Sequence, residues 1–89
     1  SGPVTLDLGF VTQNRPEAET TAAGLRTLDP RVAILEVPAD GTVVFVVSVL
    51  LEGDVADVAS LEQRAIEASG LAGDRYVGYD IVGGGVPAG

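Results

Sequence analysis

The chain has 89 residues, a formal net charge of −8 and no His, Cys, Lys, Met or Trp, so it is one small acidic domain. The missing residue types exclude catalysis by a neutral-pH imidazole switch, a thiolate or a Schiff-base amine. The charge argues against binding to nucleic-acid backbones and to anionic membrane surfaces, both of which attract basic proteins.

The first predicted elements are a strand and a helix. Residues 4–10 alternate strictly, which places four apolar side chains on one face of a strand: Val4, Leu6, Leu8 and Phe10. Asn14 and Glu17 have capping-box spacing, which predicts a helix over Pro16 to Leu28. Its buried stripe would be Ala18, Ala22, Leu25 and Leu28, and Asp29-Pro30 would end it.

A hairpin follows. Val32 to Val37 is predicted to be the second strand, and Ala39-Asp40-Gly41 has the composition of a tight turn. The third strand, Val43 to Leu51, is the most hydrophobic segment and is rich in β-branched residues. Such a run is typical of a central strand that is covered, at least in part, on both faces.

The second helix and the last strand complete the domain. Asp54 is expected to cap the helix, whose buried face would be Val55, Val58, Leu61, Ala65 and Ala68, and Ser69-Gly70 would close it. Arg75 to Val82 is the predicted last strand. We expect one domain over residues 1–82 and a flexible tail over residues 83–89.

The order β-α-β-β-α-β predicts an α+β, ferredoxin-like fold, with a four-stranded antiparallel sheet and two helices on one face. Right-handed crossovers place the first and third strands in the middle of the sheet. These are the two strands with the strongest hydrophobic patterns.

The helices can cover only one face of this sheet. If Phe45 and the alternate residues after it face the helices, the opposite face carries Val44, Val46, Ser48 and Leu50, joined by Val32 and Ile34 from the second strand. A contiguous apolar patch of this kind usually marks an association surface. The alternatives are that the tail or a loop covers the patch, or that the two faces are reversed.

The last strand carries the richest polar and aromatic group. Alternation would place Tyr76, Gly78 and Asp80 on the open face, with Tyr79 on the other. Alternatively, Tyr79 packs under a helix and plays no part in binding. The predicted interface is Val44, Val46, Ser48, Leu50, Tyr76, Gly78, Tyr79 and Asp80.

Other candidate sites are weaker. Three carboxylate pairs could in principle hold a metal or act as acid and base, but helix capping and solvation account for them: Glu17 with Glu19, Asp54 with Asp57, and Glu62 with Glu67. Gly83-Gly84-Gly85 is followed by neither a helix nor a Lys, so it meets no nucleotide-binding pattern. We expect no catalytic residue, no metal and no cofactor.

The segment Arg75-Tyr76-Val77-Gly78-Tyr79-Asp80 resembles the last strand of the ribonuclease E inhibitor B family, which carries Tyr-Asp-Gly-Trp and then an acidic residue. Tyr76, Gly78 and Asp80 match that motif, Tyr79 replaces the Trp, and Val77 replaces the Asp. The opening strand with its Ala-rich helix and the acidic second helix are also similar. The resemblance implies the same fold and an acidic protein that binds and modulates a ribonuclease.

The sequence therefore predicts a non-enzymatic interaction domain that is steered by its charge toward a basic partner and forms a homodimer. One alternative is a module that binds a small molecule near Gly9, Gly78 and Asp80. Another is a dimeric α+β barrel enzyme that uses Asp7, Ser48, Tyr76 and Asp80. The start of the chain shows no signal-peptide pattern, so we expect a cytoplasmic location.

Overall fold

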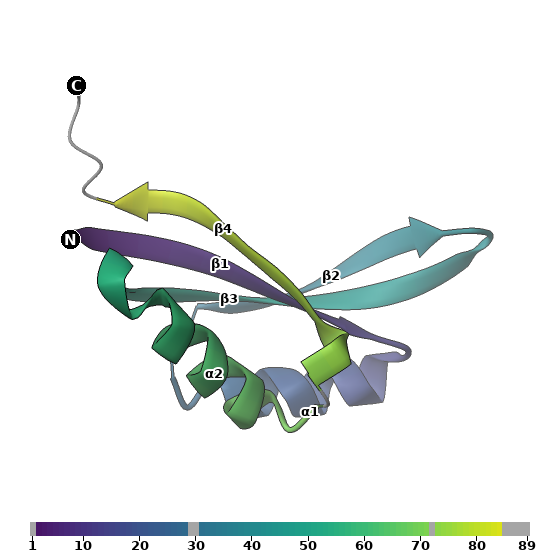
Figure 1. The fold of residues 1–89 in the computed structure, drawn as a ribbon. Helices are drawn as coiled ribbons and strands as arrows, with labels where there is room; N and C mark the ends of the chain where they lie inside the picture. The colour runs from purple at the N-terminus through teal and green to yellow at the C-terminus, as the bar shows by residue number, and fades with distance from the viewer. Residues whose placement is uncertain (1, 29–30, 72, 85–89) are drawn as a thin grey trace.

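Four antiparallel strands and two helices make up the computed structural model, which describes residues 2–28, 31–71 and 73–84 (Figure 1). The sheet order is β2-β3-β1-β4, and both helices lie against one face. This confirms the α+β, ferredoxin-like fold with the first and third strands at the centre. Short 3-10 turns, η1 and η2, precede the second helix and the last strand. In chain order the elements are β1 (Pro3–Thr12), α1 (Arg15–Leu25), β2 (Val32–Ala39), β3 (Thr42–Asp54), η1 (Val55–Asp57), α2 (Val58–Ser69), η2 (Gly73–Arg75) and β4 (Tyr76–Gly84).

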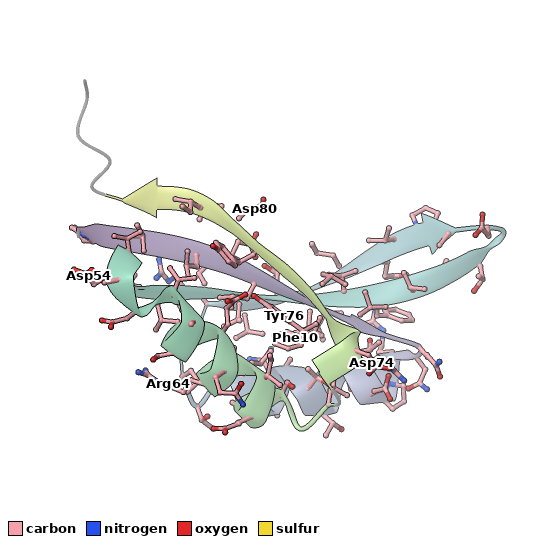
Figure 2. The ribbon with its side chains drawn as sticks, viewed as in Figure 1. Phe10, Asp54, Arg64, Asp74, Tyr76 and Asp80 are labelled. Carbon is pink, nitrogen blue, oxygen red and sulfur yellow. The ribbon has the colours of Figure 1, made fainter. Side chains whose placement is uncertain are left out.

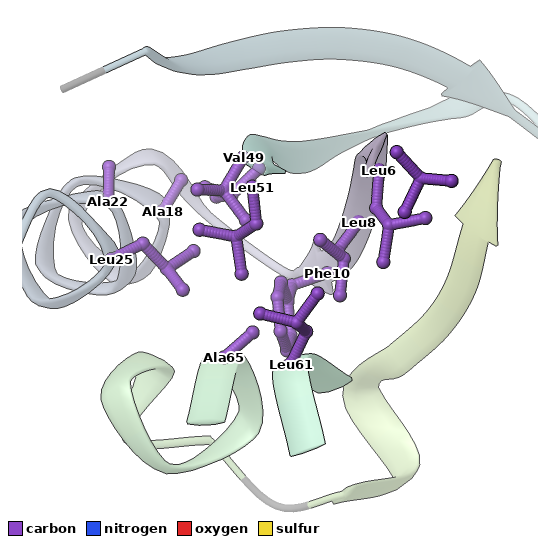
Figure 3. Packing of buried hydrophobic residues seen from close by; sticks show 12 residues of the cluster. Leu6, Leu8, Phe10, Ala18, Ala22, Leu25, Val49, Leu51, Leu61 and Ala65 are labelled. Atoms are coloured by element: carbon purple, nitrogen blue, oxygen red, sulfur yellow. The ribbon is translucent and has the colours of Figure 1, made fainter. Parts of the chain in front are cut away.

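The core lies between the sheet and the helices (Figure 3). The alternation in β1 is confirmed, since Leu6, Leu8 and Phe10 are fully buried. The pattern continues to Thr12, whose hydroxyl donates a hydrogen bond of 2.8 Å to the carbonyl of Phe45. Burial of a hydroxyl that has a hydrogen-bond partner costs little free energy. The strand can therefore extend to Thr12, beyond the end that the apolar pattern predicts.

Helix α1 begins where the sequence predicts and ends earlier. The side chain of Asn14 accepts a hydrogen bond of 2.9 Å from the backbone N–H of Glu17, which confirms the cap. The helix stops at Leu25, because the next residues form a tighter turn that the hydroxyl of Thr27 stabilises through the carbonyl of Gly24. Leu28 lies beyond this end but still packs against the core. The predicted stop, Asp29-Pro30, lies outside the described residues.

Helix α2 starts later than predicted. Asp54 caps the η1 turn instead, where its carboxylate accepts from the backbone N–H of Ala56 at 2.9 Å. Val55 is therefore on this turn and 43% exposed, whereas Leu61 and Ala65 are buried as expected. The helix ends at the left-handed Gly70, with φ of 71°.

The β2–β3 hairpin is closed by Asp40 and Gly41, both with positive φ, as a two-residue turn requires. Figure 1 shows this hairpin reaching past the end of the helical layer. The prediction that Val32 and Ile34 lie on the open face is wrong. They pair with residues of β3 that face the helices, and both pack against the core.

Strand β4 contains an irregularity that changes which side chains face the helices. Tyr76 pairs with Phe10, and Gly78 pairs with Gly9, so Val77 is an extra residue on β4, followed by Gly78 at φ of 111°. A bulge of this kind interrupts the alternation of faces. The prediction that Tyr76 shares the open face with Asp80 is therefore wrong.

The strand ends beyond its predicted limit. β4 runs to Gly84, so residues 83 and 84 belong to the strand and not to the predicted tail. Residues 85–89 of that tail lie outside the described residues. Within the part of the chain that the structure describes, neither helix has the length and hydropathy needed to cross a bilayer.

Candidate docking surface on the open sheet face

The sheet face opposite the helices is mostly apolar. Strand register places the four predicted residues of β3 on it, and they alternate with Val47 and Val49, which are fully buried on the helix side. We call this surface the open face. It consists of Leu35 and Val37 of β2, Val44, Val46, Ser48 and Leu50 of β3, Asp7, Gly9 and Val11 of β1, and Val77, Gly78 and Asp80 of β4.

Its apolar side chains are partly or largely exposed. Leu35 is 50% exposed and Val77 is 61% exposed, while the predicted residues of β3 are half-buried by their neighbours. No helix or loop of the described residues lies over this side of the sheet (Figure 1). Exposed apolar surface of this kind is typical of a contact with another molecule.

A hollow of about 280 Å³ lies in the open face. Gly9 and Gly78, which pair across β1 and β4, are among its lining residues. A Cβ atom on Gly9 would lie 3.1 Å from the Val77 side chain, and a Cβ on Gly78 would meet no atom within 4 Å. The glycines therefore leave backbone accessible where other residues would fill the hollow.

The hollow has an acidic side and an apolar side. Asp7 and Asp80 stand opposite each other on β1 and β4, and the hydroxyl of Ser48 donates a hydrogen bond to the carboxylate of Asp7. Leu35 and Val46 line the hollow from β2 and β3. Such a surface can take a side chain that is cationic at one end and apolar along its length.

Neither of these two carboxylates is neutralised by an arginine within the described residues. The ion pairs there lie elsewhere, namely Arg15–Glu36 at 3.0 Å, Arg31–Glu52 at 3.2 Å and Arg75–Glu17 at 2.9 Å. The acidic side of the hollow is thus available to a cation from outside the chain.

Tyr76 belongs to the core and not to the open face (Figure 2). Its ring centroid lies 5.2 Å from that of Phe10, and its hydroxyl donates a hydrogen bond of 2.6 Å to a carboxylate oxygen of Glu62 on α2. Burial, followed by the nearby Glu62 carboxylate, raises the pKa of Tyr76 well above its ordinary value. Tyr76 therefore fastens β4 to the helical layer.

Tyr79 lies on the same side of the sheet as Tyr76 but is more exposed. It pairs with Leu8, is 41% exposed and borders the hollow. Because Leu8 faces the helices, Tyr79 lies on the predicted side of the sheet, but it is too exposed to be packed under a helix. The bulge at Val77 brings Tyr76 to this side as well, where Tyr76 packs against the core.

Arg75, the residue just before β4, holds the start of the strand in place. Its guanidinium donates hydrogen bonds to the carbonyl of Val11 at 3.2 Å and to the carboxylate of Glu17 at 2.9 Å. The backbone N–H of Gln13, and then Arg75, hold the pKa of Glu17 below its ordinary value. This contact closes one edge of the fold and takes no part in the open face.

The predicted carboxylate pairs do not converge. Glu17, Asp54 and Glu62 have the capping and bonding roles described above, and no group of three or more metal-ligating side chains occurs within residues 2–28, 31–71 and 73–84. A second hollow, of about 560 Å³, lies where β1 begins and β3 ends. Its acidic residues are already engaged, Glu52 by Arg31 and Asp54 by the η1 turn.

Sequence reasoning missed four open-face residues, of which Val11 lies just beyond the predicted end of the first strand. Leu35 and Val37 were missed because both faces of β2 are apolar, so alternation alone cannot assign them. Alternation that places Tyr76 and Gly78 on the open face would place Val77 on the helix side, and Gly78 was the one signal of a bulge.

Comparison of the chain with protein-family models, with curated proteins and with solved structures gave no match.

Proposed function

We propose that this domain is a non-enzymatic protein-interaction module that docks a partner protein on its open face. The observation that carries the proposal is the uncovered apolar surface centred on Val46, with the hollow beside it. Desolvation of such a surface supplies binding free energy, and a mixed apolar and polar composition is typical of interfaces between separately folded proteins.

The sheet edges support docking on the face. β4 has irregular pairing with β1 near Gly78 and again between Thr5 and Leu6, and bulges of this kind hinder the addition of another strand. On the other edge, β2 carries Pro38, which cannot donate a ladder hydrogen bond. A partner that pairs with either edge would meet these obstacles, whereas the open face presents none.

The resemblance of the last strand to the ribonuclease E inhibitor B family favours a ribonuclease as the partner. The chain's net charge of −8 would speed encounter with any basic protein through electrostatic steering. The enzyme alternative loses one of its four groups, since Tyr76 is engaged with Glu62 on the far side of the sheet.

The small-molecule alternative has one observation in its favour. The predicted residues Gly9, Gly78 and Asp80 do line one hollow, which could admit a small cationic ligand. The hollow shares Leu35, Val46 and Val77 with the apolar surface around it, and this continuity favours a larger partner. The open face could also bind a second copy of the chain, and an experiment must distinguish this homodimer from binding of another protein.

The test is quantitative capture of partners from lysate of the source organism, with two matched variants. Val46→Asp adds a charge at the centre of the open face, and Val55→Asp adds the same charge at an exposed apolar site on η1. We expect the wild type and Val55→Asp to retain the same protein, and Val46→Asp to lose it while remaining folded.

Light scattering of the same three proteins separates self-association from partner binding. A particle of one chain mass that captures a heterologous protein supports the proposal. Retention of that protein by Val46→Asp would contradict it, as would a stable dimer that excludes other proteins. Recovery of a small molecule with no protein would support the alternative.

A further inference from the structure

We propose that the partner places an arginine side chain, flanked by apolar residues, in the hollow of the open face. This inference rests on the proposed docking function and specifies the chemistry of the partner. It is carried by three features that meet at one place. They are two carboxylates that form no ion pair among the described residues, exposed glycine backbone and apolar side chains at the edge of the hollow.

The acidic side suits a guanidinium group. Asp7 and Asp80 occupy paired positions on β1 and β4, and Ser48 holds the carboxylate of Asp7 by donating to it. A guanidinium group presents several N–H donors in a planar fork, so it can bond two neighbouring carboxylates at once. An ammonium group offers no such planar fork, which is why we infer arginine in preference to lysine.

The rest of the hollow suits the stem of that side chain. Gly9 and Gly78 let the stem approach the sheet backbone, and Leu35, Val46 and Val77 offer apolar contacts to its methylene groups. Arginine buries its stem on apolar surface in this way while its head reaches a polar group. Arginine is also among the residues that most often dominate binding energy at interfaces.

Charge argues against a second copy of this chain as the occupant. A two-fold contact centred on the hollow would bring Asp7 and Asp80 of both copies together. Arg15, Arg31 and Arg75 are each paired with a glutamate of their own chain. The remaining two arginines are exposed on the helical layer: Arg26 at the end of α1 and Arg64 on α2, which Figure 2 shows on the other side of the sheet.

Contact of those two arginines with the hollow of another copy would join unlike surfaces. Repeated contacts of that kind form open chains of molecules unless the rotation closes a ring, so they do not give a simple dimer. The open face therefore fits a heterologous partner that brings its own positive charge.

The experiment selects short linear peptides from a random phage-displayed library on the immobilised full-length domain, then measures the affinity of synthetic copies. We expect the selected peptides to share an arginine between apolar residues. Replacement of that arginine by citrulline, which keeps the shape and removes the charge, should weaken binding roughly 10- to 100-fold. Added salt should weaken binding of the arginine peptide more than that of the citrulline peptide.

Three protein variants locate the contact. Asp80→Asn and Asp7→Asn should each weaken binding of the arginine peptide roughly 10- to 100-fold. Glu19→Gln removes the same charge from an exposed position on α1 and should leave affinity unchanged. Thermal unfolding of each variant shows whether it is folded.

The outcomes separate this inference from the proposed function. Peptides that need Val46 but lack a basic residue, or that bind Asp80→Asn as well as the wild type, would overturn the inference and leave the docking face intact. Binding that is insensitive to Val46→Asp, or no retained peptide, would overturn both. Arginine amide binding as tightly as the selected peptides would assign the hollow to a small cation.

Discussion

Asp7 and Asp80 face each other across β1 and β4, with two negative charges at one paired position of an antiparallel sheet. Like charges in directly opposed positions destabilise a sheet by an amount comparable to the gain from a favourable pair, roughly 0.2–1 kcal/mol. Ser48 donates to Asp7 but brings no positive charge. The pair therefore lowers the stability of the domain.

Asp80→Asn should accordingly raise the free energy of unfolding by about 0.2–1 kcal/mol at low ionic strength, with a smaller gain in high salt. Urea unfolding at two salt concentrations measures both effects. The control is Glu19→Gln on α1, which removes one negative charge from the chain as Asp80→Asn does. Equal stabilisation by both variants would assign the effect to net charge and not to the opposed pair.

Gly24 sets the distance between the two helices. A Cβ atom at this position would lie 2.2 Å from the carbonyl oxygen of Ala68 on α2, which is backbone and has little freedom to move. Gly24→Ala should destabilise the domain although alanine is the better helix former by about 1 kcal/mol, because the two helices would have to separate.

Gly70→Ala is the matched comparison. Its Cβ would meet no atom within 4 Å, so its cost is only the left-handed backbone, about 1–2 kcal/mol. We expect Gly24→Ala to lower the unfolding midpoint further than Gly70→Ala does. The reverse order in urea unfolding would mean that α1 and α2 are not in close contact at Gly24.

Tyr76→Phe removes one hydrogen bond and keeps the ring on Phe10. The expected loss is about 0.5–1.5 kcal/mol, the usual net value of such a bond, because Glu62 keeps access to water. Chemical denaturation at neutral pH measures it. An unchanged stability would show that the Tyr76–Glu62 contact contributes nothing to the fold.

The same tyrosine predicts a loss of stability in base. The pKa of Tyr76 is raised in the folded state, so the neutral form stabilises the fold at any pH below the unfolded pKa, near 10. As the pH rises beyond that value, the unfolded state releases its proton first and the stabilisation decreases. Tyr76→Phe should show a smaller decrease above pH 10, and an identical decrease would contradict this assignment.

Glu17 predicts the opposite dependence in acid. The backbone N–H of Gln13 and the guanidinium of Arg75 lower the pKa of this carboxyl, so its contribution is present above the unfolded pKa and is lost as the pH falls through the folded pKa. Glu17→Gln should reduce the acid dependence of the unfolding midpoint below about pH 4.5. An equal acid dependence in Glu19→Gln would show that the effect is general to the helix.

The sequence predicts the fold because its periodic signals agree with one another. The alternation in β1, the cap at Asn14 and the turn at Asp40-Gly41 each specify an element locally, and all three are present in the structure. The helix limits are less predictable. α1 ends at Leu25 because the side-chain hydroxyl of Thr27 stabilises a tighter turn. The hydrophobic pattern of the sequence does not predict this end.

The candidate site is only partly predictable for a different reason. Val46 and its neighbours on β3 follow from simple alternation. The face of Tyr76 depends instead on a bulge in the pairing of β4 with β1, where its partner Phe10 lies far away in the sequence. One extra residue in a strand moves the side chains before it to the face opposite the one that alternation predicts. β2 is ambiguous because Ile34 and Leu35 are equally apolar, and only pairing with β3 assigns one to the core and the other to the surface.

The central claim is that the open face is uncovered in the free domain, and methyl relaxation by a soluble paramagnetic agent tests it most directly in the full-length chain. Leu35 and Val77, which are 50% and 61% exposed, should relax strongly, while the fully buried Val47 and Val49 should be protected. Protection of Leu35 and Val77 equal to that of Val47 would mean that another part of the chain or a second copy already covers the face, and the proposed docking surface would be wrong.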